Sequence, residues 1–316
     1  MAEAVYSSEG DQIFYTPAAA TSAGTVVRLP DGRAGYLVSA AAAGQKVSVQ
    51  VSGIATVEKT DSMVMLKGSK LYWDVSASKA HLLQALGTPD FFLGTAVATA
   101  SSSATTVSVM LNMEPKYTLA LKDGCVCAPI PAITANPQGM AFAFGNGYAM
   151  KFDTAAEAEK FDALSINSVA VGTPGILNAL ICVNTNGDDA AFDLNVGLAN
   201  GTHATDADSI TESLFCHIDG ASTNIAFESA DGTTEVAATD STVDFTAGTP
   251  FLVQWDLTDD EDIQAYVNGV NVLPASVFKL NNATGPLRLL VHMEKTANDS
   301  PGNVTVMNLG LHTFDV

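Results

Sequence analysis

The sequence contains few charged residues, and few of those are basic. Only 15% of the 316 residues are charged, and 14 Lys and Arg stand against 34 Asp and Glu, which gives a formal net charge of −20. Binding to nucleic acid or to an anionic membrane surface requires clustered Lys and Arg. The composition therefore argues against both as partners.

Cysteine is also scarce, and long apolar runs are absent. The four cysteines are too few for a disulfide framework, and they are Cys125, Cys127, Cys182 and Cys216. In a strand, residues 125 and 127 would lie about 6.6 Å apart, which suits a disulfide poorly. No stretch approaches the ~18 apolar residues of a membrane helix, and the first residues show no secretory signal pattern. We expect free thiols, mostly buried, in a soluble protein made in the cytoplasm.

Apolar residues make up 47% of the chain, chiefly Ala and Val among Ser, Thr and Gly, which favours short strands over helices. In residues 1–112, Val47, Val49 and Val51 alternate with polar residues, the period of a half-buried strand. Further strands are predicted over 54–57, 70–74, 93–98 and 107–111, and Asp31-Gly32 indicates a hairpin turn. This spacing predicts a small β-barrel or sandwich.

A proline-rich stretch follows over residues 113–138. Pro115, Pro129, Pro131 and Pro137 interrupt it, and the segment 128–131 is sterically restricted to extended backbone. We expect a semi-rigid connection between two domains here.

Residues 139–316 predict a second all-β domain. A hairpin turns at Gly145-Asn146-Gly147, and Thr154 with Glu157 forms a capping-box pattern that predicts one short helix over 154–161. The strands predicted after it cover 180–183, 192–198, 214–218, 225–228, 251–257, 263–267, 287–293 and 304–313. So many strands predict a two-sheet jelly-roll sandwich.

Charge divides the chain in the same place as composition does. Residues 1–112 hold seven basic and eight acidic side chains, a net charge of −1, and the remaining residues carry the other −19. We infer a near-neutral module that docks on a partner and an acidic module that stays solvated and repels its neighbours.

Residues 1–112 resemble a family of small phage-encoded head decoration, or capsid cement, proteins. The features that carry the resemblance are Ala40–Ala43 before Gly44, Val47–Val51 leading to Gly53-Ile54, Gly68 before Leu71-Tyr72-Trp73-Asp74, Leu93–Ala96, and Val107–Leu111. The resemblance implies a small trimeric domain that clamps neighbouring subunits of the major capsid protein at three-fold or quasi-three-fold positions. The acidic extension departs from the family, whose members are typically one short domain.

The second module resembles the concanavalin-like, or laminin-G-like, jelly roll. The segment Phe251–Asp256, with Trp255, leads through a polar turn to Ile263–Gly269, which ends in Tyr-Val-Asn-Gly. Asn268-Gly269 supplies the positive φ values of a tight hairpin. The fold hosts lectins, enzymes and inert spacers, so it does not fix a function.

The candidate metal ligands are acidic residues in predicted turns, and they are weak candidates. Asp256, Asp259, Asp260 and Asp262 are close in sequence and offer the oxygen ligands that Ca²⁺ prefers, yet their spacing matches no calcium loop. A solvated hairpin turn is the alternative. The same two interpretations apply to a second group, Asp206, Asp208 and Glu212.

No catalytic or cofactor-binding residue stands out. The five histidines are scattered without ligand spacing, and His217, His292 and His312 lie in strand patterns, where a core or cross-strand role is favoured. Nucleophile-elbow, zinc-helix, phosphate-loop and dinucleotide motifs are absent. We expect no cofactor and no enzyme activity, although a carboxylate pair for glycoside hydrolysis is defined only by distance in space.

Adjacent aromatic residues give the candidate interface. Tyr72 and Trp73 point to opposite faces of a strand, so one belongs to the core and the other is free for a subunit or capsid contact. We expect a decoration protein on the outer capsid surface of a tailed phage, with the acidic module facing outward. The alternatives are a lectin-like adhesin for a host-surface glycan and a glycosidase.

Overall fold

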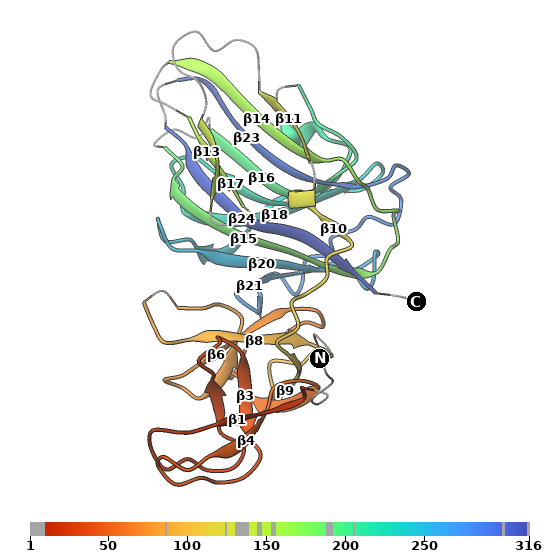
Figure 1. The fold of residues 1–316 in the computed structure, drawn as a ribbon. Coiled ribbons are helices and arrows are strands. Elements are labelled where there is room, and N and C mark those ends of the chain that lie inside the picture. The colour runs from red at the N-terminus through yellow and green to blue at the C-terminus, as the bar shows by residue number, and fades with distance from the viewer. Residues whose placement is uncertain are drawn as a thin grey trace, which may run out of the picture. The chain divides into compact units, whose positions relative to one another are not determined.

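The computed structural model describes residues 10–85, 87–123, 125–129, 139–143, 147–152, 156–187, 192–204, 206–298 and 301–314. In these residues the chain consists of β-strands and two 3-10 turns (Figure 1). The chain divides into two compact units, Met1–Lys116 and Tyr117–Val316. None of the described helical segments is long and apolar enough to span a membrane.

The first unit contains two antiparallel sheets. The four-stranded sheet has the order β1-β4-β3-β2 and the five-stranded sheet the order β5-β9-β8-β6-β7. The strands are β1 Gln12–Tyr15, β2 Val26–Arg28, β3 Ala34–Leu37, β4 Val47–Gln50, β5 Ile54–Glu58, β6 Lys70–Asp74, β7 Lys79–His81, β8 Phe91–Ala96 and β9 Thr106–Leu111. No pair of strands closes either sheet in the described residues, although an isolated bridge joins Lys59, next to β5, to Ala80 in β7. The all-β class is confirmed, and of the two predicted forms, barrel or sandwich, a closed barrel is not observed there.

Asn112 connects the two sheets of the first unit. Its Nδ2 donates to the backbone oxygens of Ala34 (2.9 Å) and Val51 (2.7 Å), and its Oδ1 accepts from the Ala34 amide at 2.8 Å. Asn112 has φ 57°, a left-handed conformation that Asn tolerates better than most residues. One side chain thus satisfies three backbone groups where β9 ends.

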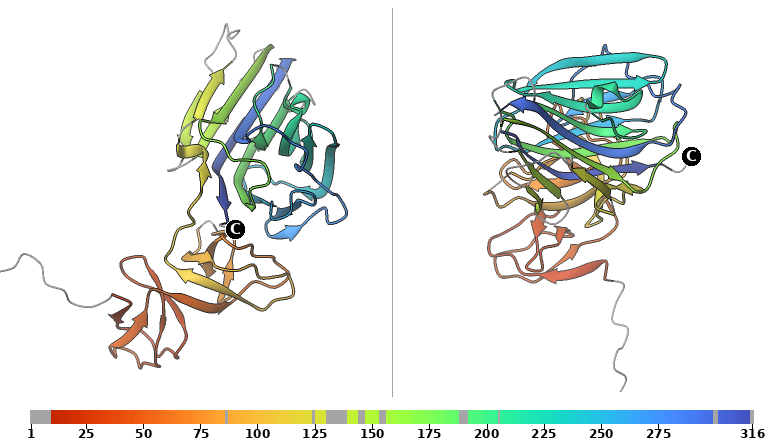
Figure 2. Two further views of the ribbon diagram at one scale, coloured as in Figure 1. Left: turned by 90° about the vertical axis from the view of Figure 1, so that its right-hand side faces the viewer. Right: turned by 90° about the horizontal axis from the view of Figure 1, so that it is seen from above.

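The second unit is a sandwich of two antiparallel sheets (Figure 2). One sheet has the order β12-β13-β24-β15-β20-β21-β22, with β10 beside β24, and the other the order β11-β14-β23-β16-β17-β18-β19. The first sheet comprises β10 Leu119–Ala120, β12 Gly139–Ala143, β13 Gly147–Lys151, β15 Gly175–Thr185, β20 Phe251–Asp256, β21 Gln264–Val267, β22 Val270–Asn271 and β24 Asn303–Thr313. The second comprises β11 Cys125–Pro129, β14 Glu157–Ser165, β16 Phe192–Ala199, β17 Glu212–Asp219, β18 Asn224–Asp231, β19 Glu235–Asp244 and β23 Arg288–Asn298. The 3-10 turns are η1 Leu121–Asp123 and η2 Ala207–Ser209.

Aromatic packing fills the sandwich core. The Trp255 ring is 1% exposed and makes edge contacts with Phe227 at 4.8 Å and Phe278 at 5.4 Å between centroids. This edge-to-face arrangement suits the ring quadrupoles. Asn268 and Gly269 have φ values of 50° and 78°, which confirms the predicted tight turn between β21 and β22.

Two segments differ from the sequence-based predictions. The predicted helix over 154–161 is wrong: residues 153–155 lie outside the described residues, and β14 begins at Glu157. Strand pairing with β11 on one side and β23 on the other outweighs the local capping pattern. Part of the predicted connection, 113–138, is also not a linker, because β10 pairs with β24 and β11 with β14.

The cysteines that the structure describes with side chains are free thiols. Cys182 and Cys216 are buried and Cys125 is half-buried. Burial raises the pKa of the Cys216 thiol to about 12, which keeps it protonated and unreactive.

Candidate functional site

The second unit carries polar side chains on the sheet face opposite its core. In β16, Leu194 and Val196 belong to the core, and the alternate residues Asp193 and Asn195 point the other way. The strand register aligns such residues in two rows across β14, β23, β16 and β17, which we call the two polar rows. The first row is Asp162, His292, Asn195 and His217, and the second row is Lys160, Glu294, Asp193 and Asp219.

The first of the polar rows is buried although it faces away from the core. Asn195 and His292 are 0% exposed, and Asp162 and His217 are below 5%. The segment 200–211 contributes to this burial: its residues Ala207 and Ile210 pack against Phe215 and other apolar residues of the sheet. The same segment carries η2, which places Asp208 beside His217.

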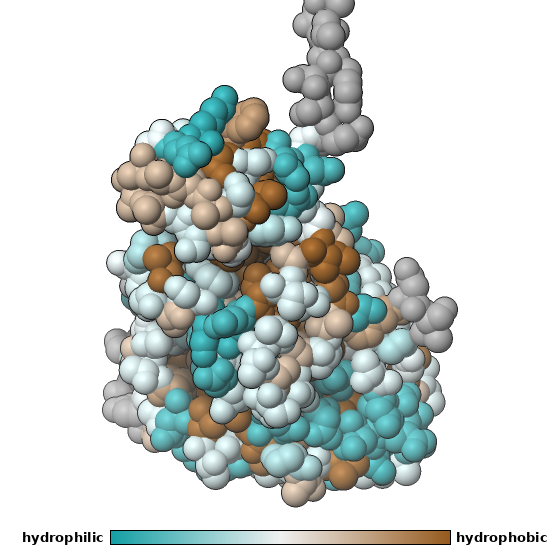
Figure 3. Space-filling model, turned by 90° about the horizontal axis from the view of Figure 1, so that it is seen from below, coloured by the Kyte–Doolittle hydropathy of each residue, from teal (hydrophilic) through white to brown (hydrophobic). Residues whose placement is uncertain are grey.

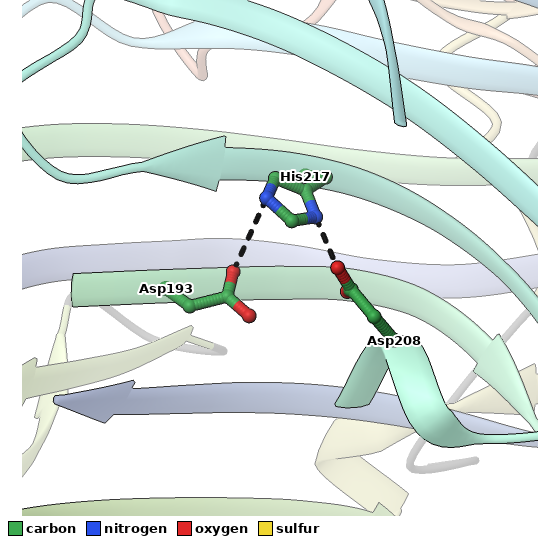
Figure 4. Close-up of side chains that lie close together, drawn as sticks. All are labelled: Asp193, Asp208 and His217. Carbon is green, nitrogen blue, oxygen red and sulfur yellow. Dashed lines mark ion pairs between the residues drawn. The ribbon is translucent and has the colours of Figure 1, made fainter. Parts of the chain in front are cut away.

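His217 lies at the centre of the densest group of charges (Figure 4). Its Nδ1 is 3.3 Å from Asp208 Oδ1 and 3.6 Å from Glu228 Oε2, and its Nε2 is 3.0 Å from Asp219 Oδ1 and 3.5 Å from Asp193 Oδ1. We call these five residues, together with Asn195, the His217 cluster.

Asn195 connects the carboxylates of the His217 cluster. Its Nδ2 donates to Asp208 Oδ1 at 2.7 Å and to Glu228 Oε1 at 2.9 Å. Its Oδ1 is buried and makes no hydrogen bond, and the same is true of Asp193 Oδ1. Buried polar atoms without a partner are rare and are often satisfied by water or an ion.

The environment shifts several pKa values strongly. Burial raises the pKa of Asp193 to about 8, although the positive charge of His217 acts to lower it. Burial by itself would lower the pKa of His217, but hydrogen bonds with Asp208 and Glu228 outweigh it and raise that pKa to about 12. At neutral pH the cluster therefore holds an imidazolium ion and a protonated Asp193.

A second histidine lies beside the cluster in the first polar row. His292 Nδ1 is 2.7 Å from Asp162 Oδ1, and its Nε2 is 3.2 Å from Glu294 Oε2. Burial opposes protonation, but these two carboxylates raise the pKa of His292 to about 9. Lys160 Nζ lies 3.1 Å from Asp162 Oδ2 and donates to the backbone oxygen of His203, which ties the 200–211 segment to β14.

We expect the second unit to lose stability as pH rises from about 5 to 9. Groups whose pKa is raised on folding bind protons that the unfolded chain has released, and this holds for Asp193 from about pH 4 to 8 and for His292 from about pH 6.5 to 9. Their stabilisation is complete at low pH and is lost as pH rises through the folded-state pKa. The measurement is thermal unfolding without divalent cations, followed by Trp255 fluorescence in a Trp73→Phe background.

Asp193→Asn is the matched variant for this pH dependence. It should flatten the decline between about pH 5 and 8, because the amide does not titrate. Acid loss of stability below about pH 4 should remain, because Asp208, Glu212 and Asp231 have lowered pKa values and lose their contribution on protonation. A wild-type melting temperature that stays constant or rises between pH 5 and 9 would contradict the assignment.

Among the residues that the structure describes, two groups of side chains could hold a metal ion. Asp193, Asp208 and His217 form one group and Asp193, Asp206 and Glu294 the other, with ligand atoms in each group within 4.8 Å of one another. The first group offers one nitrogen and two carboxylates, and the second offers carboxylates alone.

The acidic turn suggested by the sequence contributes to neither group. Asp256 Oδ1 accepts hydrogen bonds from the amide and hydroxyl of Thr258, and Asp259 Oδ1 accepts from the Glu261 amide. Asp262 Oδ1 accepts from Gln264 Nε2 at 2.7 Å. Asp260 is half-buried in the same turn. The described side-chain hydrogen bonds of the turn are local, and its backbone is held to a distant segment where the Asp260 carbonyl accepts from the Leu280 amide at 2.9 Å.

The second acidic group of the sequence is divided between two places. Asp208 belongs to the His217 cluster and Asp206 caps η2, accepting from the Asp208 amide at 2.8 Å. Glu212 holds a different loop, because its carboxylate accepts hydrogen bonds from the amides of Thr284 and Gly285.

The aromatic pair lies on β6 in the first unit. Trp73 is 8% exposed, whereas Tyr72 is half-buried on the opposite face. The Tyr72 ring makes an edge contact with Phe92 at 6.2 Å, and Lys70 Nζ lies 4.7 Å from the centre of the Phe92 ring. Trp73 therefore packs mainly inside the unit.

Sequence reasoning named Asp208 as a weak metal candidate and placed His217 in a strand, but it missed that the two lie in one cluster. Its residues come from β16, η2, β17 and β18, so no spacing along the chain reveals them. A weak signal was available in β16, where Asp193 and Asn195 alternate with core leucine and valine on a strand that the sequence predicts. That pattern indicates a polar face but does not identify its partners.

The folds define a protein built from two all-β units, of which the second is a jelly-roll type sandwich. Residues 7–111 match a family model described as phage cement protein. The match lies within the first unit and confirms the family resemblance inferred for residues 1–112. No curated protein was found to match the chain.

Several solved structures are similar to part of the chain. They include the carbohydrate-binding module CBM66 from Bacillus subtilis (7% identity, TM-score 0.37, 56% of this chain and 92% of that one). The carbohydrate recognition domain of Emp47p has 9% identity and a TM-score of 0.42, over 60% of this chain and 89% of that one. The alginate lyase AlgAT5 has 17% identity and a TM-score of 0.36, over 54% and 80%. Likenesses of this size give no information on a ligand or an activity.

Proposed function

We propose that the chain is a structural virion protein that decorates the outer surface of a tailed-phage capsid and stabilises it. The first unit docks on the major capsid protein, and the acidic second unit faces outward. The observation that carries the proposal is the match of residues 7–111 to the phage cement family, which accounts for most of the first unit. A protein that binds the assembled shell and not dispersed subunits stabilises the shell by mass action.

The outer face of the four-stranded sheet supports docking. Phe14 in β1 pairs with Ser48 in β4, and the Val38 amide donates a hydrogen bond to the Ser48 carbonyl at 3.0 Å. These three residues therefore lie side by side across β1, β4 and the end of β3. Phe14 is 71% exposed and Val38 48%. The next row is Gln12, Gln50 and Tyr36, so both rows are uncharged. We call these six residues the Phe14 face.

Surface hydropathy agrees with a docking role for the first unit. Figure 3 shows brown and tan side chains among the teal and white ones on the molecule seen from below. Exposed large apolar residues of the first unit include Phe14, Val38, Ile54 and Val75. Aromatic and aliphatic groups exposed in this way are suited to an interface core.

Trimer formation and a role without catalysis complete the proposal. Cement-type domains that associate in threes would clamp capsid subunits at three-fold positions, with Tyr72 as an additional contact candidate. The lectin-like alternative has less support: the large apolar residues exposed among the described residues of the second unit are Ile166, Val270 and Val277, and none is aromatic. Sugar binding in open sites commonly uses exposed aromatic rings.

Residues 1–116 alone should occupy capsids as the full chain does. The chain divides after Lys116, and the family match ends at residue 111, so the docking unit is contained in this fragment. The measurement is occupancy on purified undecorated capsids by imaging and sedimentation, after circular dichroism has shown that the fragment is folded. Residues 117–316 are the control and should not bind. If residues 117–316 bind and residues 1–116 do not, the second unit makes the capsid contact and the proposed orientation is wrong.

A further inference from the structure

The His217 cluster has more negative groups than its hydrogen bonds satisfy. Four carboxylates contact one imidazole ring, and Asp206 and Glu294 add two more within reach of Asp193. Buried charges in proteins are paired, neutralised by protons, or bound to metal ions. The arrangement therefore raises the question of a positive ligand.

The geometry of three side chains suits one small cation. The ligand atoms of Asp193, Asp208 and His217 all lie within 4.8 Å of one another, which leaves room for a single ion between them. They come from β16, η2 and β17, so three separate segments meet at one imidazole ring, with Asp193 beside Nε2 and Asp208 beside Nδ1 (Figure 4). Convergence from separate segments distinguishes the group from a run of exposed acids in a turn.

A second observation points to the same place independently of the charges. Asn195 is 0% exposed, and its Oδ1 makes no hydrogen bond although its Nδ2 makes two, to Asp208 and Glu228. Asp193 Oδ1, two residues away on the same strand face, also makes none. The Asp193 oxygen has only the 3.5 Å ion-pair contact with His217 Nε2, and the Asn195 oxygen has no donor, so both are groups that a cation or its bound water would satisfy.

We propose that Asp193, Asp208 and His217 bind one divalent cation of the class that accepts imidazole together with carboxylate, such as Mn²⁺ or Zn²⁺. Metal ligands must be deprotonated, so binding displaces the protons that His217 and Asp193 hold in the metal-free chain, and the affinity should rise with pH. The imidazole nitrogen favours such ions over Ca²⁺ and Mg²⁺, which prefer oxygen ligands alone. Glu228 and Asn195 act as outer partners that orient Asp208 and His217.

Cation binding would also fix the segment 200–211 on the sheet. Asp208 lies in η2 of this segment, and His217 and Asp193 lie on the strands beneath it. A metal ion that bridges these elements replaces repulsion between carboxylates with shared coordination. The segment should then become more resistant to proteolysis when the metal is bound.

The test uses the full chain after removal of metals with a chelator. Titration with MnCl₂ is followed by the loss of the free Mn²⁺ paramagnetic resonance signal, and titration with ZnCl₂ by calorimetry. We expect one ion per chain, a higher melting temperature with metal, and slower cleavage within 200–211. Asp193→Asn and Asp208→Asn should each weaken binding by at least about tenfold. The Asp208 side chain is 42% exposed, so this variant tests the site even if the Asp193 variant does not fold.

Two further variants separate the proposal from general attraction to an acidic surface. Asp259→Asn, in the exposed acidic turn, should leave binding unchanged, and His217→Gln should weaken Zn²⁺ binding more than Ca²⁺ binding. Failure of the wild type to bind either ion would overturn the proposal, and so would an equal loss in the Asp259 variant. Tight Ca²⁺ binding that His217→Gln does not alter would overturn the proposed ligand class. None of these outcomes depends on capsid binding.

Discussion

Phe14→Asp should reduce capsid occupancy about 30-fold or more, the factor that corresponds to a hot-spot cost of about 2 kcal/mol. Phe14 is 71% exposed on β1, so the folded unit does not need its ring for core packing. Within a docked interface, however, the introduced carboxylate would lose its water, a cost that an ion pair with the nearby Lys46 would offset only in part. Lys46 Nζ lies 4.1 Å from the centre of the Phe14 ring, so a positive charge borders this part of the Phe14 face.

Occupancy across a salt series is the measurement for the Phe14 variant. A contact built on apolar burial should change little with salt, because the long-range repulsion of the acidic unit is already screened within about 8–10 Å at physiological ionic strength. The control removes three charges from the second unit, as Asp259→Asn, Asp260→Asn and Asp262→Asn together, and should bind as the wild type does. If the triple variant loses binding and Phe14→Asp does not, the acidic unit makes the contact. A steep loss of binding with salt would show the same.

Tyr72→Ser distinguishes the two sheets of the first unit. If this variant loses occupancy and Phe14→Asp does not, the capsid contact lies on the five-stranded sheet and the Phe14 face is not the docking surface. Trp73 is a poorer probe, because it is buried and its replacement would disturb the unit itself.

Glu159→Leu should destabilise the second unit by about 3–5 kcal/mol, the typical cost of breaking a buried ion pair from one side. Glu159 and Lys295 face each other across β14 and β23, with Oε2 and Nζ 3.2 Å apart and both side chains at most 1% exposed. Removing the carboxylate takes away this ion pair and places an apolar side chain beside the buried Lys295 charge. Denaturant unfolding followed by Trp255 fluorescence measures the change.

The double variant Glu159→Leu with Lys295→Met should recover most of this loss, because two apolar side chains of similar volume replace the pair. The exposed pair of Lys79 and Asp61 is the control: its atoms are 3.0 Å apart, but the Asp61 side chain is 72% exposed. Asp61→Asn should cost about 1 kcal/mol or less in the first unit. A cost below 1 kcal/mol for Glu159→Leu would contradict the prediction, and so would a double variant less stable than the single one.

The strand patterns were predictable where one face of a strand is buried. Val47 and Val49 alternate with polar residues in β4, and the predicted strands near residues 192, 214, 251 and 304 match β16, β17, β20 and β24. Alternation failed as a guide in β14, where a local capping pattern predicted a helix. It also failed in β19, which is an edge strand exposed along most of its length and carries little apolar signal.

The sequence by itself determined the all-β class, the division between a near-neutral and an acidic part, and the cement-type character of the first unit. These properties reside in composition, in the period of two along each strand and in residues close together in the chain. Only the tertiary structure decided that His217 lies among Asp193, Asp208, Asp219 and Glu228. The register between strands and the position of the 200–211 segment bring these residues together, and both depend on contacts between distant parts of the chain. The resulting burial and charge, and with them the shifted pKa values, follow from this assembly.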